Sequence, residues 1–188
     1  MFRPLLFFSL IPLIIGLIVR WWFGVRVLGN DGARPCRCDL NRWLPVPDDA
    51  SIVHRAEESA AEFGRQVRLK ALADWHDQEP KAAASREKTR RFGLAVPPFT
   101  GIVAVFAVLV GKIPVLGAII ILIAATAVAT VFNLLSLPAE LTAITRSSRR
   151  IRDEKNFPNI DDEEAVMHCA IAHAWDAALP PILRWIHR

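Results

Sequence analysis

The sequence contains no tyrosine and only three cysteines among its 188 residues. Cys36 and Cys38 are separated by a single residue, which is too close for an ordinary structural disulfide, and no second pair follows that would complete a zinc knuckle. A disulfide framework therefore does not explain how this chain folds. We expect free thiols that face the reducing side of a membrane.

Charged residues are rare in three long stretches. Hydrophobic residues make up 53% of the chain and its mean hydropathy is positive, which is too apolar for an ordinary soluble domain, whereas 22% charged residues are too many for a pure membrane bundle. A membrane span needs about 20 predominantly apolar residues, and the stretches 5–25, 94–110 and 113–137 qualify. The sequence predicts an all-α integral membrane protein with three transmembrane helices, an N-terminal anchor plus a helical hairpin, and cytoplasmic amphipathic helices.

The first stretch ends in basic and aromatic residues. Arg20, Trp21 and Trp22 follow the apolar run, and tryptophan beside arginine at the end of a span is typical of a membrane-interface anchor. A cleaved secretory signal is the alternative, because Arg3 precedes an apolar core. No small-residue cleavage pattern follows Val19, which favours an uncleaved anchor.

The second and third stretches are separated only by residues 111–114, so they must be antiparallel neighbours. Pro97 and Pro98 are expected in the first turn of the second span, where a missing N–H costs least. Small residues recur at helical spacing in both spans and would let the backbones approach closely. These residues are Gly101, Ala104, Ala107, Ala125 and Ala129.

The basic residues predict an orientation. All lysines and arginines except Arg3 and Lys112 lie in the segments 20–91 and 146–188. The positive-inside rule then places the long loop and the C-terminus in the cytoplasm and the N-terminus outside. The net charge of +4 needs no nucleic acid, because anionic lipid headgroups attract juxtamembrane basic clusters. We therefore expect lipids, and no nucleic acid, among the partners.

These features divide the chain into four parts. They are an N-terminal transmembrane anchor over 1–28, a cytoplasmic linker and helical hairpin over 29–93, the transmembrane hairpin over 94–138, and cytoplasmic C-terminal helices over 139–188. In the last part, the third span should continue as a helix to about residue 155, with Pro138 near a bend. A final helix should follow over 163–179, because acidic residues fill its first turn.

The second part should contain two helices. A long helix is expected to begin at Asp48 or Asp49 as N-cap and to end before Pro80, and a helix over 81–91, with a basic face toward solvent and headgroups, should lead into the second span. The apolar stripe of the long helix predicts packing on a neighbouring helix or, alternatively, a coiled-coil partner. The stripe comprises Val53, Ala56, Ala60, Phe63, Val67, Ala71 and Trp75.

Three potential metal ligands share one face of the final helix. Cys169, His173 and Asp176 follow one another at spacings of four and three residues, and such residues could supply two coordination positions of a zinc ion. The same face would otherwise be the solvent-exposed side of an amphipathic helix. No second ligand pair is evident, so we predict neither a metal site nor a cofactor.

Glu140 lies just beyond the third span. A carboxylate there is costly unless it faces water, a partner or a protein interior. Two interpretations remain open, a functional carboxylate and a structural one that caps a helix or pairs with Arg146.

The region after the first span resembles a known family. A two-span hairpin, the segment Asn133-Leu-Leu-Ser-Leu-Pro-Ala-Glu-Leu-Thr-Ala, basic residues, an acidic patch and an alanine-rich terminal helix resemble the C-terminal half of the YugP-type bacterial membrane zinc metallopeptidases. The resemblance covers about 101–175 and implies a bacterial inner membrane and a role for Glu140 as a metal ligand. Such peptidases carry a His-Glu-x-x-His motif that supplies two zinc ligands and a base. This chain has none, so the resemblance implies a degenerate member without peptidase chemistry.

The sequence thus favours a non-catalytic accessory or scaffold subunit of a larger membrane complex. It would dock on other membrane subunits through its transmembrane hairpin and amphipathic helices, and self-association is also open. One alternative is a membrane zinc metallopeptidase that uses His168, Cys169, His173 and Glu140, and only this alternative needs zinc. The other is a pseudo-peptidase that regulates an active paralogue.

Overall fold

The computed structural model describes residues 2–37, 57–154, 157, 159–180 and 183. Its elements, in chain order, are α1 (Phe2–Arg20), the π-helical segment η1 (Trp21–Val25), α2 (Arg26–Asn30), β1 (Pro35–Arg37), β2 (Glu57–Ser59), α3 (Ala60–Gln78), α4 (Pro80–Leu109), α5 (Val115–Asp153) and α6 (Ile160–Ala178). Cys38, the expected N-cap at Asp48 or Asp49, and the stripe residues Val53 and Ala56 lie outside the described residues.

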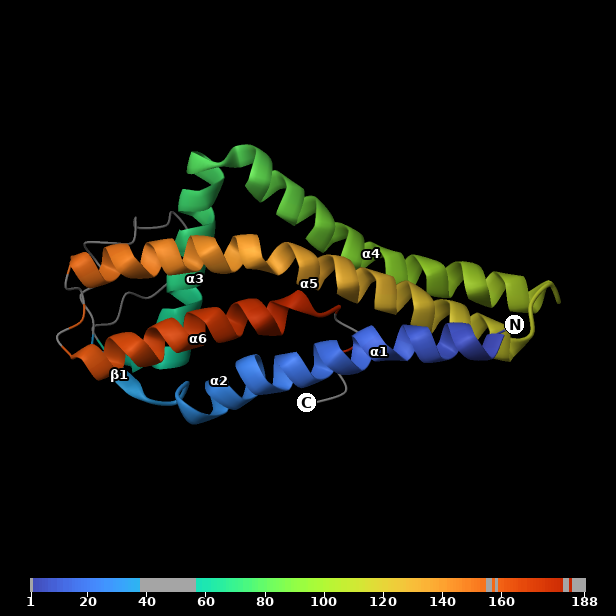
Figure 1. Ribbon diagram of the computed structural model, residues 1–188, viewed down its shortest axis with the longest axis horizontal. Coiled ribbons are helices and arrows are strands. Elements are labelled where there is room, and N and C mark those ends of the chain that lie inside the picture. Colours follow the sequence, from blue (N-terminus) through green and yellow to red (C-terminus); the bar gives the residue numbers. More distant parts are fainter. Residues whose placement is uncertain (1, 38–56, 155–156, 158, 181–182, 184–188) are drawn as a thin grey trace.

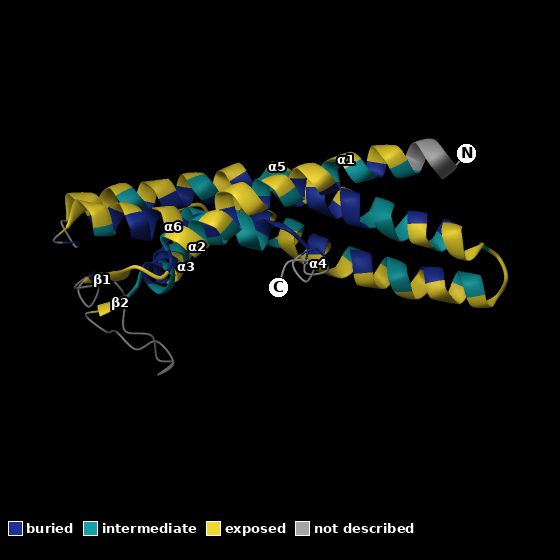
Figure 2. Ribbon diagram, turned by 90° about the horizontal axis from the view of Figure 1, so that it is seen from below, coloured by how far each residue is buried: buried dark blue, intermediate teal, exposed yellow. Residues whose placement is uncertain are grey.

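Three helical segments are long and apolar enough to cross a membrane. They are Leu6–Asn30, Pro80–Leu109 and Val115–Asp153, which confirms the predicted all-α membrane fold. In both Figure 1 and Figure 2, α5 lies between α1 and α4, and the N-terminus shares an end with the loop that joins α4 to α5. Helices α3 and α6 lie toward the opposite end. The side of the membrane on which each end lies stays a prediction.

Helices α4 and α5 are longer than the spans that they contain. With 30 and 39 residues, they extend about 45 Å and about 58 Å at 1.5 Å per residue, whereas the hydrocarbon core is about 30 Å thick. Pro97 and Pro98 therefore lie inside α4, and their predicted place in the first turn of a helix is wrong. The helix starts at Pro80 instead, and a single buried face continues from Arg86 through Gly93 and Pro97 to Ala104. Helix α5 likewise runs through Pro138.

Helix α3 crosses α5 and α6, as Figure 1 shows. Its N-cap is Ser59, whose Oγ accepts a hydrogen bond from the Glu62 N–H at 3.3 Å. Residues 57–59 were expected to be helical, but they form the strand β2. This strand pairs antiparallel with β1, which precedes it in the sequence by about 20 residues. The predicted break before Pro80 is confirmed, since α3 ends at Gln78 and α4 starts at Pro80.

The core at this end joins α3, α5 and α6. The described part of the predicted stripe is buried in it, with Phe63, Val67 and Ala71 at 2% exposure or less. Gly64 allows α3 to approach α6 closely, because a Cβ there would stand 2.7 Å from the Ala170 nitrogen. The stripe therefore packs on a neighbouring helix of the same chain, as the first of the two interpretations expects.

The segment after α6 returns toward the spans. Leu179 and Leu183 are buried against Leu13 of α1 and Ala127 of α5, in a second and smaller apolar cluster. Gly16 makes room for this segment, because a Cβ there would stand 3.0 Å from Leu179 Cδ2. Leu179 and Leu183 thus pack on both α1 and α5.

Candidate functional site

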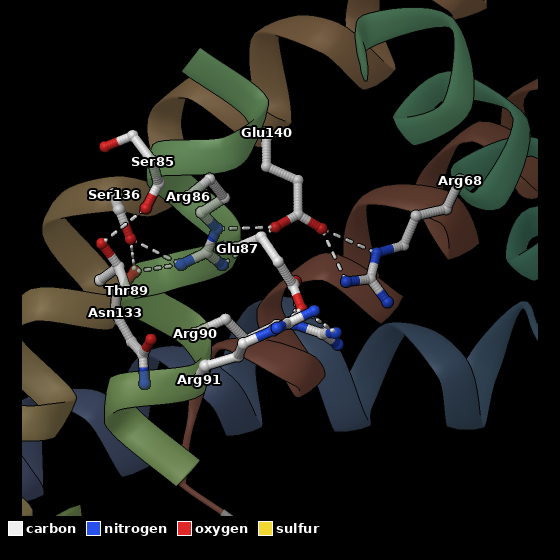
Figure 3. Close-up of polar contacts among 10 residues, drawn as sticks. All are labelled: Arg68, Ser85, Arg86, Glu87, Thr89, Arg90, Arg91, Asn133, Ser136 and Glu140. Atoms are coloured by element: carbon white, nitrogen blue, oxygen red, sulfur yellow. Dashed lines mark hydrogen bonds and ion pairs between the residues drawn. The ribbon is translucent and has the colours of Figure 1, made fainter. Parts of the chain in front are cut away.

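Glu140 is held by two arginines from two other helices. Its Oε1 accepts hydrogen bonds from Nε and Nη2 of Arg68 on α3 at 2.9 and 2.6 Å, and its Oε2 accepts from Nε and Nη2 of Arg86 on α4 at 3.0 and 2.9 Å (Figure 3). Glu140 itself is 2% exposed. A single carboxylate therefore ties α3, α4 and α5 together where the hairpin leaves its apolar stretch. The pairing with Arg146 that one interpretation expected is wrong, because Arg146 pairs with Glu79 at 3.0 Å.

Arg86 makes further contacts with α5. Its Nη1 donates to Ser136 Oγ at 2.6 Å and to the Asn133 carbonyl oxygen at 3.1 Å. The Ser136 hydroxyl also donates to that carbonyl at 3.1 Å. Arg86 is thus buried, which corrects the prediction that the basic residues of 81–91 form only a solvated face. Lys88, Arg90 and Arg91 do remain exposed.

The Asn133 side chain lies next to this cluster, against Gly93 of α4. A Cβ at Gly93 would collide with Asn133 Nδ2 and would stand 3.0 Å from Asn133 Cγ. Glycine at 93 is therefore what allows the two helices to pack with an amide between them. Asn133 is 4% exposed, and its Oδ1 has no hydrogen-bond partner among the described residues.

The charges of the cluster do not balance. Two guanidinium groups face one carboxylate, and arginine keeps its proton under all ordinary conditions. Burial of such cations is tolerated only when they are paired and hydrogen-bonded. Glu140 and the oxygens of Ser136 and Asn133 supply that pairing.

This arrangement does not fit a zinc ion. Each oxygen of Glu140 already accepts two N–H groups, and the neighbouring guanidinium groups have no lone pair to offer a metal and would repel it. Within the described ranges, no group of three or more histidine, cysteine, aspartate or glutamate side chains lies close enough to hold a metal ion. The structure thus places a structural ion pair where the resemblance implies a metal ligand.

The three candidate ligands on α6 point to different partners. Cys169 is fully buried in the core, His173 Nε2 lies 2.9 Å from the Ala61 carbonyl oxygen, and Asp176 pairs with Arg20 at 2.8 Å. The prediction that this face is the solvent-exposed side of the helix is wrong. It is covered because α3 and η1 pack across it at small residues such as Gly64 and Gly24.

The three predicted interface anchors differ in exposure. The side chains of Trp21 and Trp22 are 47% and 50% exposed, as a membrane-interface position requires, and the Arg26 guanidinium lies 4.6 Å from the Trp22 ring centre. Arg20 is only 8% exposed, because it turns inward to Asp176 and to the Leu183 carbonyl oxygen. A π-helical turn begins directly after Arg20 and brings Gly24 against α6.

The described thiols are free and buried. Cys36 and Cys169 are both buried and unbonded to other cysteines, as predicted. Burial raises the pKa of the Cys169 thiol to about 11, with smaller contributions from Asp31 and Cys36. Burial likewise raises the pKa of the Cys36 thiol, and Asp162 adds to the effect. Both groups therefore behave as small core residues.

Sequence reasoning singled out Glu140 but missed its partners. One usable signal is the spacing of Arg86, which lies seven residues before Gly93 and thus on the buried face of α4. For Arg68, which directly follows the stripe residue Val67 on α3, we find no comparable signal.

Comparison of the chain with protein-family models, with curated proteins and with solved structures finds no match. The class of the protein therefore follows from its fold and this cluster. It is a membrane-embedded α-helical protein whose three apolar helices join a helical cap, α3 and α6, through buried and partly buried ion pairs.

Proposed function

We propose that the protein is a non-catalytic accessory or scaffold subunit of a larger membrane protein assembly, and that helix α4 is its main docking surface within the membrane. The supporting observation is the one-sided packing of α4. Only 17% of the residues in its most apolar stretch are buried, against 22% in the first span and 33% in α5, because α4 packs chiefly on α5. Large apolar side chains cover its outer face. Among them are Ile102, Val103, Val105, Phe106 and Leu109.

The Glu140 cluster supports the same proposal. A carboxylate that accepts four hydrogen bonds from two arginines is poorly suited to act as a base or a metal ligand, but it is well suited to hold α3 across the base of the hairpin. A fixed cap and a fixed hairpin form a preorganised surface, which lowers the entropy cost of docking.

Site-specific photo-crosslinking in native membranes tests this function. A photoreactive residue at Phe106, which is 64% exposed on α4, should give a discrete crosslinked protein band. The matched control is Ile15 on α1, which is 51% exposed and also apolar. Crosslinking to lipid alone at Phe106, or the same protein band from both positions, would contradict docking through α4.

A further inference from the structure

A groove of about 530 Å³ lies between α3 and the part of α4 that precedes its apolar stretch. Five cationic side chains line it, whereas only two carboxylates do, so the groove has an excess of three positive charges. The cationic residues are Arg68, Arg86, Lys88, Arg90 and Arg91. Such an excess attracts and orients an anion.

Some of these cations have donors to spare. Within the described part of the chain, Lys88 takes part in no hydrogen bond or ion pair, and Arg68 uses only Nε and Nη2 on Glu140. Arg90 and Arg91 share the single carboxylate of Glu87. An anion in the groove could therefore be bound without breaking the Glu140 cluster.

The groove has apolar residues on its α3 side, and its α4 side leads into the apolar part of α4. Leu69, Leu72 and Trp75 line its α3 side, and Leu69 is 45% exposed. Phe92 and Leu94, at 46% and 41% exposure, follow Arg91 directly on α4. A free phosphate would leave these apolar surfaces in water, whereas a lipid would cover them with its glycerol and acyl chains.

We propose that this groove binds the headgroup of an anionic phospholipid, with the phosphate near Lys88 and Arg91 and the acyl chains beside Phe92 and Leu94, which precede the docking face of α4. This site is independent of the docking function proposed above. Basic residues near a membrane attract anionic lipids in general. The groove would hold one such lipid at a defined position.

Native mass spectrometry of the full chain in mild detergent tests the site. The protein is titrated with phosphatidylglycerol, with zwitterionic phosphatidylcholine, and with inorganic phosphate as a competitor. We expect phosphatidylglycerol to bind more tightly than phosphatidylcholine. The double variant Lys88→Gln and Arg91→Gln should weaken phosphatidylglycerol about thirtyfold, since each basic residue near a surface contributes about fivefold.

The control variant removes the same charge elsewhere. Lys81→Gln with Arg149→Gln changes two exposed basic residues outside the groove and should leave the affinity within about twofold. Lys88→Arg keeps the charge and should bind as the wild type does. Equal binding of the two lipids, an equal loss in the control variant, or displacement of the lipid by stoichiometric inorganic phosphate would each overturn the proposal.

Discussion

Replacement of Glu140 by glutamine should destabilise the protein strongly, although glutamine has almost the same size. The amide offers one acceptor oxygen where the carboxylate offers two, and its NH2 group cannot accept a hydrogen bond from arginine. Arg68 and Arg86 would then both lack their counter-charge, and one of them would also lose its acceptor oxygen. The exposed fractions of the Glu140 and Arg86 side chains are 3% and 6%, so water cannot compensate.

The magnitude follows from this burial. Loss of one partner of a buried ion pair costs about 3–5 kcal/mol, and the 16% exposure of the Arg68 side chain favours the lower end, about 3 kcal/mol. For a chain of this size, that corresponds to a decrease in Tm of about 6–12 °C. Thermal unfolding followed by circular dichroism in mild detergent would measure it.

Two controls separate this effect from a general loss of charge. Glu79→Gln removes the exposed partner of Arg146 and should leave Tm unchanged. Glu140→Gln combined with Arg68→Met and Arg86→Met removes the unpaired cations and should recover most of the lost Tm, because apolar replacement of a buried ion pair is often neutral. A Tm for Glu140→Gln within 2 °C of wild type, or a triple variant no more stable than the single one, would refute the reasoning.

Two further predictions concern packing and thiol chemistry. Gly93→Ala should lower the free energy of unfolding by about 1–3 kcal/mol, because the added Cβ collides with the Asn133 amide. Asn133→Ala in the same chain should restore stability. The control is Gly29→Ala, whose Cβ meets nothing within 4 Å. Cys169 should resist iodoacetamide at pH 7.5 and react faster as pH rises toward its pKa of about 11, because only the thiolate attacks. Peptide mass spectrometry of labelled native and denatured protein would show this, and rapid labelling of native Cys169 at pH 7.5 would contradict it.

The spans could be predicted from sequence because their signal is local. An uncharged run of about 20 residues leaves few alternatives to a membrane helix, and Pro80 ends one helix and starts the next for equally local reasons. The same local rule misplaced Pro97 and Pro98. It treats a proline as the start of a helix, whereas the packing of a continuous buried face on α5 keeps α4 helical through both.

The site could be predicted only in part because its partners are distant in sequence. Arg68 and Arg86 are 72 and 54 residues from Glu140, and no local pattern couples them. The polar face of α6 shows the same difficulty. The helical periodicity indicates that Cys169, His173 and Asp176 share a face. It does not indicate whether water or another helix covers that face.

Two ion-pair sites give α3 and α6 a definite position relative to the three apolar helices. Arg20–Asp176 joins the end of α1 to α6, and the Glu140 cluster joins α3 to the hairpin. The apolar core that joins α3, α5 and α6 is stabilised by a non-directional effect, so it constrains the register of these helices less sharply than a hydrogen-bonded pair does. Arginine–carboxylate pairs are directional, and a shift of one helical turn, about 5.4 Å, would break every bond in the cluster. Under the proposed function, a partner on α4 would meet a cap whose position is set by the same carboxylate that anchors α4.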